Sequence, residues 1–161
     1  MKGIWSSGFA LVRPPGHHAD MYGGIEGFCV YNNVAIGAKY AIKQYESVKR
    51  VVIFDWDIHH GNSTYKFLKD DPNVLFISLH RFDNGNFYPG KLGSIQNNGE
   101  SKGKGLKIHV PWSMFNKSHM IGTQDYIYVF ERVLFPIAEA FGPDLILISS
   151  GFDSARGDPL G

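Results

Sequence analysis

Cysteine and long apolar runs are what this sequence of 161 residues has least of. Cys29 stands alone, which excludes an internal disulfide and a zinc cluster built from thiolates, and we expect a reducing compartment such as the cytoplasm or the nucleus. No apolar run reaches the roughly 18 to 20 residues of a membrane-spanning helix, because Asp, Arg, His or Pro interrupts each one. We therefore expect no membrane partner.

The net charge is also close to zero. The 16 basic and 15 acidic residues give a formal charge of +1, which provides no field strong enough to capture nucleic acid directly. The apolar content of 43% and the aromatic content of 14% suffice at this length for one globular domain with a buried core. Two independent domains are not expected.

The apolar residues form short runs that are separated by longer stretches with helical spacing. Most of the runs are near-continuous, as in strands that are covered on both faces. The predicted strands are residues 8–12, 51–56, 74–79, 106–110 and 145–149. The predicted helices are residues 32–45, 63–68 and 124–141. Strands that alternate with helices predict an α/β domain built around a mostly parallel sheet.

Polar motifs follow four of the predicted strands. In order along the chain they read RPPGHH, DIHHGN, HRFD and GFDSARGD. In open parallel sheets, functional groups gather beyond the carboxyl ends of the strands, so the four motifs are predicted to converge on one site. The glycine-rich stretch 90–105 is instead predicted to be a mobile surface loop without a functional signal.

The segment Asp55-Trp56-Asp57-Ile58-His59 has the spacing of a metal site. Alternation along an extended chain places Asp55, Asp57 and His59 on one face. Without a bound cation, the two carboxylates would repel each other and one of them would have to take up a proton. Zinc needs a third ligand, for which Asp153 is the best candidate. The alternative is that an aspartate caps the next helix and that His59 is an ordinary loop residue.

The pair His17-His18 follows two prolines and a glycine. Both side chains face one site only from a tight turn, which Gly16 permits. Next to a metal site, such imidazoles accept a proton from water and donate one to a leaving group, with Asp55 and Asn62 as candidate partners for their other ring nitrogens. The alternative is a surface pair of histidines.

Taken together, the strings RPPGHH, DWDIHHGN, SLHR and GFDSARGDP resemble the histone deacetylase family. The resemblance extends over residues 8–161, and RPPGHHAD, the tryptophan of DWDIHH and Asn62 of HHGN are typical of class II. It implies an incomplete three-layer α/β/α fold of the arginase/deacetylase kind. Residues 1–161 are then expected to be the central part of a single catalytic domain whose N- and C-terminal portions are missing.

The resemblance also implies roles for individual residues. Zinc, one ion per chain, is expected on Asp57, His59 and Asp153. The catalytic residues are expected to be His17, His18, Asp55 and Asn62. The acyl-lysine tunnel is expected to contain Gly27, Phe28 and Tyr88, where Tyr88 departs from a more common phenylalanine. A structural potassium ion is expected at Asp55, Asp57, His59, Ser78 and Leu79. A second monovalent ion is implied near the backbone of Leu68, Asp71 and Val74.

The implied activity is zinc-dependent hydrolysis of acetyl-lysine in a histone or another protein. It is expected to serve chromatin and transcription regulation, in complexes of the corepressor type. The family's catalytic tyrosine has no counterpart in residues 1–161, and a donor of that kind contributes about 3 to 4 kcal/mol to the transition state. We therefore expect little activity from these residues alone. The alternatives are an amidohydrolase of acetylpolyamines or other small acyl-amines, and a binding fragment that holds acyl-lysine without turnover.

Overall fold

Four of the five predicted strands form one parallel sheet in the computed structural model, which describes residues 6–19, 22, 24–114 and 121–161. The strands are β1 (Val51–Asp55), β2 (Val74–Arg81), β3 (Lys107–Trp112) and β4 (Leu145–Ser149). Their order across the sheet is β3-β2-β1-β4, and all three pairings are parallel. The prediction of a parallel α/β sheet is confirmed.

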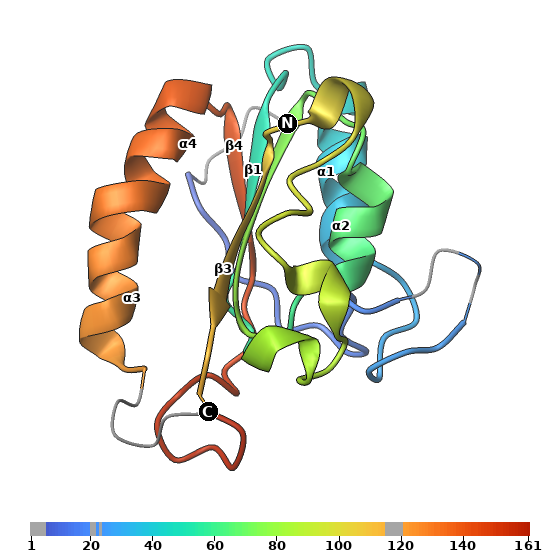
Figure 1. Cartoon of the computed structure of the whole chain (residues 1–161). Helices are drawn as coiled ribbons and strands as arrows, with labels where there is room; N and C mark the ends of the chain where they lie inside the picture. The colour runs from blue at the N-terminus through green and yellow to red at the C-terminus, as the bar shows by residue number, and fades with distance from the viewer. Residues whose placement is uncertain (1–5, 20–21, 23, 115–120) are drawn as a thin grey trace.

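Helices cover both faces of this sheet. Helices α1 (Asn33–Gln44) and α2 (Asn62–Leu68) lie on one side, to the right in Figure 1. The opposite side carries α3 (Thr123–Val129), the π-helical turn η4 (Phe130–Leu134) and α4 (Phe135–Phe141). Three short 3-10 turns, η1 (Asp83–Gly85), η2 (Lys91–Gly93) and η3 (Ser101–Gly103), lie between β2 and β3. The arrangement is a three-layer α/β/α sandwich.

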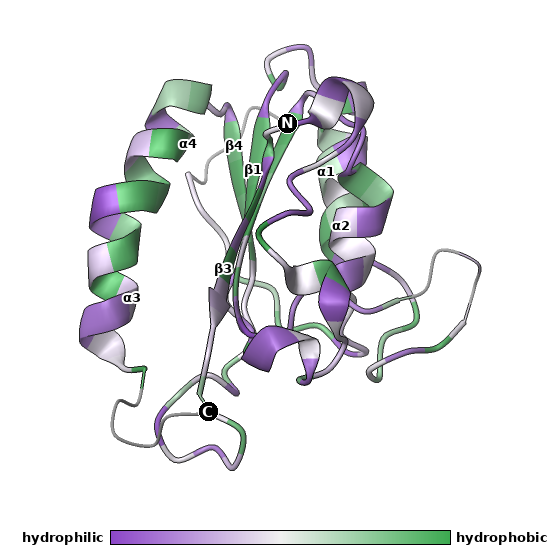
Figure 2. Ribbon diagram, in the orientation of Figure 1, coloured by the Kyte–Doolittle hydropathy of each residue, from purple (hydrophilic) through white to green (hydrophobic). Residues whose placement is uncertain are grey.

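The alternation of side chains along β1 and β2 creates two separate cores. Val51 and Ile53 point toward α1 and α2, where they pack with Phe76 of β2. Val52 and Phe54 point the other way and pack against Leu134 and Ala138 of the η4–α4 segment. Strands β1 and β4 are largely green, the colour of hydrophobic residues, in Figure 2. Both central strands are therefore buried on both faces, which explains why their sequences read as continuous apolar runs.

The predicted helix 124–141 is interrupted by one π-turn. Pro136 has no N–H group to donate to the carbonyl oxygen four residues earlier, so the regular helical bonding cannot continue through it. The chain instead changes to π spacing over Phe130–Leu134 and resumes as α4 with Pro136 in its first turn.

Two expectations about local structure were wrong. Residues 8–12 do not form a strand and pair with no strand of the described sheet, and Leu11 is 91% exposed. A strand needs a partner, and a local apolar pattern does not supply one. The stretch 90–105 is not a loose surface loop, because it contains two 3-10 turns whose glycines Gly93 and Gly103 are buried.

None of the helices in the described residues is long and apolar enough to cross a membrane.

Adjacent residues of the η4 turn provide a test of the second core. Leu134 is fully buried against the sheet, whereas Val133 is 40% exposed. We expect Leu134→Ala to lower the free energy of unfolding by about 2 to 5 kcal/mol because it leaves a cavity, and Val133→Ala to lower it by much less. Urea unfolding of both variants measures this. Equal losses would contradict the assignment of the buried face.

Candidate metal and proton-transfer site

The side-by-side ends of β1 and β4 bring distant carboxylates together. Asp55 lies opposite Ser149 in the parallel register, so the loops that follow the two strands begin at the same level of the sheet. The backbone N–H of Ile58 donates to Asp153 Oδ1 at 2.9 Å. Ser154 Oγ donates to the carbonyl oxygen of Trp56 at 2.9 Å. These bonds hold the loop containing Asp153 against the loop that follows β1.

Asp57, His59 and Asp153 meet at this junction. Each offers a ligand atom, and these atoms all lie within 4.8 Å of one another. His59 Nδ1 lies 3.0 Å from Asp57 Oδ1 and 3.0 Å from Asp153 Oδ2. Burial alone would lower the pKa of His59, but Asp153 and Asp57 together raise it to about 9. Two carboxylates and one imidazole, all still partly exposed, make a donor set that suits zinc with one position open.

His17 forms a buried pair with Asp55. Its Nδ1 lies 2.9 Å from Asp55 Oδ2, and the side chains are only 7% and 0% exposed. Its Nε2 lies 3.7 Å from Asp57 Oδ2. The imidazole ring therefore lies between the carboxylates of Asp55 and Asp57. Burial lowers the pKa of His17, but the charges of Asp55 and Asp57 outweigh this effect and raise it to about 9. His17 is therefore an imidazolium at neutral pH in the metal-free chain.

His18 is held in one orientation by a relay of amide and carboxylate groups. Its Nδ1 lies 2.7 Å from Asn62 Oδ1, and the Nδ2 of Asn62 donates to Glu26 Oε2 at 3.2 Å. Because Glu26 takes the amide hydrogen, the oxygen of Asn62 faces His18 and accepts its Nδ1–H, which leaves Nε2 as an acceptor. Burial and the charge of His17 lower the pKa of His18 to about 4. Gly27 lies directly against the His18 ring and leaves no room there for a side chain.

Two aromatic side chains, Tyr88 and Phe87, lie next to the histidines of the site. The Tyr88 ring lies 5.0 Å from the His18 ring and 6.0 Å from the His59 ring, measured between centroids. Phe28 is 88% exposed and contacts none of the described aromatic rings. Phe87, which the sequence analysis did not select, stacks on His59 with a centroid distance of 5.1 Å and an interplanar angle of 14°.

The residues expected around potassium also lie together. Asp55 is the parallel-strand partner of Ser78, and the N–H of Arg81 donates to the carbonyl oxygen of Ile58 at 2.8 Å. The D-x-D-x-H loop therefore lies against the end of β2, where Ser78 and Leu79 are buried. The role of these residues as potassium ligands stays a prediction.

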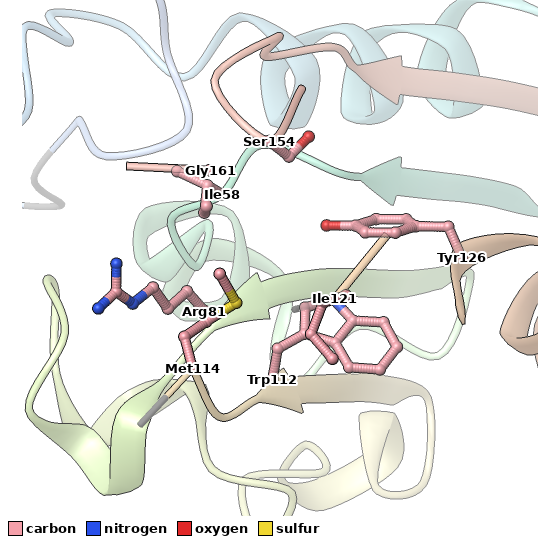
Figure 3. A pocket seen from close by; sticks show the side chains of 8 residues that line it. All are labelled: Ile58, Arg81, Trp112, Met114, Ile121, Tyr126, Ser154 and Gly161. Carbon is pink, nitrogen blue, oxygen red and sulfur yellow. The ribbon is translucent and has the colours of Figure 1, made fainter. Parts of the chain in front are cut away.

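Three supporting residues could not be found from motifs. Glu26 orients Asn62, and Phe87 covers His59. Tyr126 of α3 lines a small pocket behind the site, with its hydroxyl group on the side of Ser154 (Figure 3). Each lies outside the strand-end motifs, and its position depends on tertiary contacts. For Tyr126, the apolar spacing of the predicted helix indicated only that this helix packs against the sheet.

Comparison with known proteins identifies the family of the chain. The sequence profile of the family described as "Histone deacetylase domain" matches residues 1–161. Histone deacetylase HDA1 of Candida albicans is 50% identical over 100% of this chain and 19% of its own length. Histone deacetylase clr3 of Schizosaccharomyces pombe is 49% identical over 100% of this chain and 23% of its own length. Histone deacetylase 15 of Arabidopsis thaliana is 50% identical over 96% of this chain and 27% of its own length.

A solved structure of a histone deacetylase has the same fold as this chain. The crystal structure of the HDA15 HD domain superposes with a TM-score of 0.89 at 49% identity, and the match covers 97% of this chain and 42% of that chain. The chain belongs to the histone deacetylase family, in its class II form, and has the α/β fold of the arginase/deacetylase kind. It spans between 19% and 27% of the length of these curated relatives.

The charge of His17 is expected to depend on Asp55. In metal-free protein, Asp55→Asn should lower the pKa of His17 from about 9 by roughly 1 to 3 pKa units, because burial is then less strongly opposed. NMR titration of the histidine ring signals measures this, with Asp158→Asn as a control in a nearby loop. Since the pKa of His17 is raised on folding, protonation of His17 stabilises the fold at pH 6.5, and this contribution is lost as the pH rises through about 9. An unchanged His17 signal in Asp55→Asn would contradict the pairing.

Proposed function

We propose that this chain forms the metal-binding half of the active site of a zinc-dependent protein lysine deacetylase. The observation that carries the proposal is the convergence of Asp57, His59 and Asp153, with ligand atoms within 4.8 Å of one another, beside the paired histidines. The histone deacetylase names of the relatives support the same reaction. The remainder of the domain is proposed to lie outside these residues, since the match covers 42% of the solved HDA15 chain.

Zinc on these three residues would supply a Lewis acid that polarises an amide carbonyl and acidifies water. The two carboxylates provide negative charge, and His59 contributes a neutral nitrogen once it has lost its proton. Asp153 is already oriented by the N–H of Ile58, and Asp57 Oδ1 accepts from the N–H of His59 at 2.7 Å. The ligand geometry is therefore set by backbone hydrogen bonds.

The paired histidines are proposed to move the protons of the reaction. His18 is neutral and presents Nε2 as an acceptor, so it takes a proton from the attacking water. When the bond between the carbonyl carbon and the lysine nitrogen breaks, the same proton goes to the departing amine. Asp55 holds the ring of His17 through Nδ1, which fixes His17 beside Asp57 and the His18 ring. The products are acetate and free lysine.

The substrate is proposed to enter between aromatic side chains. Tyr88 stands at the edge of the His18 ring, so an acyl-lysine stem that passes it delivers its amide to the histidines. Phe28 is exposed on the neighbouring loop and provides a second apolar surface. We further propose a structural potassium ion at the junction of the Asp55–His59 loop with Ser78 and Leu79.

Metal content and hydrolysis test the proposal together. Wild-type protein should contain about one zinc ion per chain, and Asp57→Asn and Asp153→Asn should lose it because each removes a ligand charge. Asp158→Asn, in the same loop as Asp153, is the matched control. Elemental analysis and hydrolysis of acetyl-lysine peptides, carried out on the intact protein that contains these residues, measure both properties.

The outcomes separate the alternatives. Folded wild-type protein without zinc would overturn the metal assignment. Zinc with turnover of acetylated polyamines but not of peptides would identify a small acyl-amine amidohydrolase. Zinc and peptide binding without turnover would identify a binding module.

Zinc uptake should also release a proton. With the pKa of His59 at about 9, this ring is protonated in the metal-free chain at pH 7, and it must be neutral to bind a metal. We expect release of about one proton per zinc from this ring at pH 7 and almost none above pH 10. Calorimetry in buffers of different ionisation enthalpy measures the number. Release that does not change with pH would contradict the role of His59 as a ligand.

A further inference from the structure

A lysine is buried at the beginning of β3, away from the candidate metal site. Lys107 is only 1% exposed, which is rare for a lysine. Burying an ammonium group is strongly unfavourable unless hydrogen bonds and nearby charges replace its water. The contacts of Lys107 Nζ therefore decide what the residue does.

Two backbone carbonyl oxygens replace water around the ammonium. Lys107 Nζ donates to the oxygen of Val74 at 2.7 Å and to the oxygen of Asp71 at 3.1 Å. The Asp71 carboxylate instead accepts from Lys39 Nζ at 2.5 Å and from the N–H of Asn73 at 2.8 Å. Lys107 is thus recognised by main-chain oxygens and not by a direct ion pair.

The turn between α2 and β2 holds these oxygens in place. The N–H of Asp71 donates to the carbonyl oxygen of Leu68 at 2.9 Å, which closes the turn after the helix. Val74 is the first residue of β2 and pairs with Val51 of β1. The two oxygens therefore point at Lys107 because the fold fixes them. They do not depend on the lysine for their orientation.

The loop before β3 closes over the lysine stem. Gly99 has a φ of +100°, and a Cβ atom there would lie 3.2 Å from Lys107 Cγ and would collide with the carbonyl group of Gly103. Only glycine fits this approach. The enclosed ammonium remains charged at neutral pH, since burial lowers the pKa of Lys107 to about 8 while the carboxylates of Asp71 and Asp70 oppose that shift.

Preoriented carbonyl oxygens around a buried single positive charge are the chemistry that proteins use to bind potassium. We propose that the ammonium group of Lys107 takes the place of a bound monovalent cation. It occupies the position beside the carbonyl oxygens of Asp71 and Val74, between α2 and β2, that a free potassium-sized ion would otherwise occupy. The resemblance implied a monovalent ion at the backbone of Leu68, Asp71 and Val74, and Lys107 makes that ion unnecessary in this chain. The proposal does not depend on the proposed enzymatic function.

Without the ammonium group of Lys107, the turn between α2 and β2 should bind a free potassium-sized ion. Lys107→Ala should bind one more rubidium ion per chain than the wild type, and its unfolding temperature should rise more steeply with potassium chloride. Choline chloride at equal ionic strength should not replace potassium. Lys104→Ala, which removes an exposed lysine from the same loop, should match the wild type in both measurements. Equal rubidium binding by Lys107→Ala and the wild type would overturn the proposal.

A second measurement keeps the proposal open to disproof if Lys107→Ala does not fold. Crystals of the wild-type protein grown in rubidium chloride should show no anomalous scatterer between the oxygens of Asp71 and Val74. A rubidium ion at that position would overturn the proposal, because it would show that the lysine does not replace the ion.

Discussion

The parallel pairing of β1 with β4 is the constraint on which the site depends. These strands are far apart in the sequence, and their register places Asp55 level with Ser149. A shift by one residue would turn the following side chains to the opposite face and separate Asp57 from Asp153. The backbone bond from Ile58 to Asp153 extends the pairing beyond the strands. The candidate metal ligands are therefore positioned by the pairing of β1 with β4 and by the hydrogen bond from Ile58 to Asp153 that follows it.

The chemistry-bearing residues could be predicted because parallel strands share one carboxyl edge. Asp57, His59 and Asp153 follow buried strands directly, so their convergence needs only the sheet and its direction. Glu26 could not be predicted, because its contact with Asn62 joins an irregular segment to the first residue of α2. The strand expected at residues 8–12 failed for the related reason that strand formation depends on a partner, and no described strand lies next to it.

Three buried histidines, His60, His80 and His109, pack together next to the candidate metal site. His60 points away from its neighbour His59, and its ring lies 4.7 Å from that of His80 and 4.5 Å from that of His109. Burial lowers the pKa of all three imidazoles, so they are neutral. His80 Nε2 lies 2.9 Å from the carbonyl oxygen of Gly93. The glycine-rich stretch is thus fixed by these histidines, and its composition reflects close packing, which a sequence pattern does not distinguish from mobility.

Opposite charges hold the carboxylates at the centre of the site together in the metal-free chain. Asp55 and Asp57 lie where burial acts to raise the pKa of each carboxyl group, and Asp153 lies beside them. In the metal-free chain His17 and His59 carry positive charge and hold the pKa of Asp57 below its usual range. A divalent cation held by Asp57, His59 and Asp153 would take over that role only after His59 had lost its proton. The protonated ring of His59 therefore balances carboxylate charge that a bound divalent cation would otherwise balance.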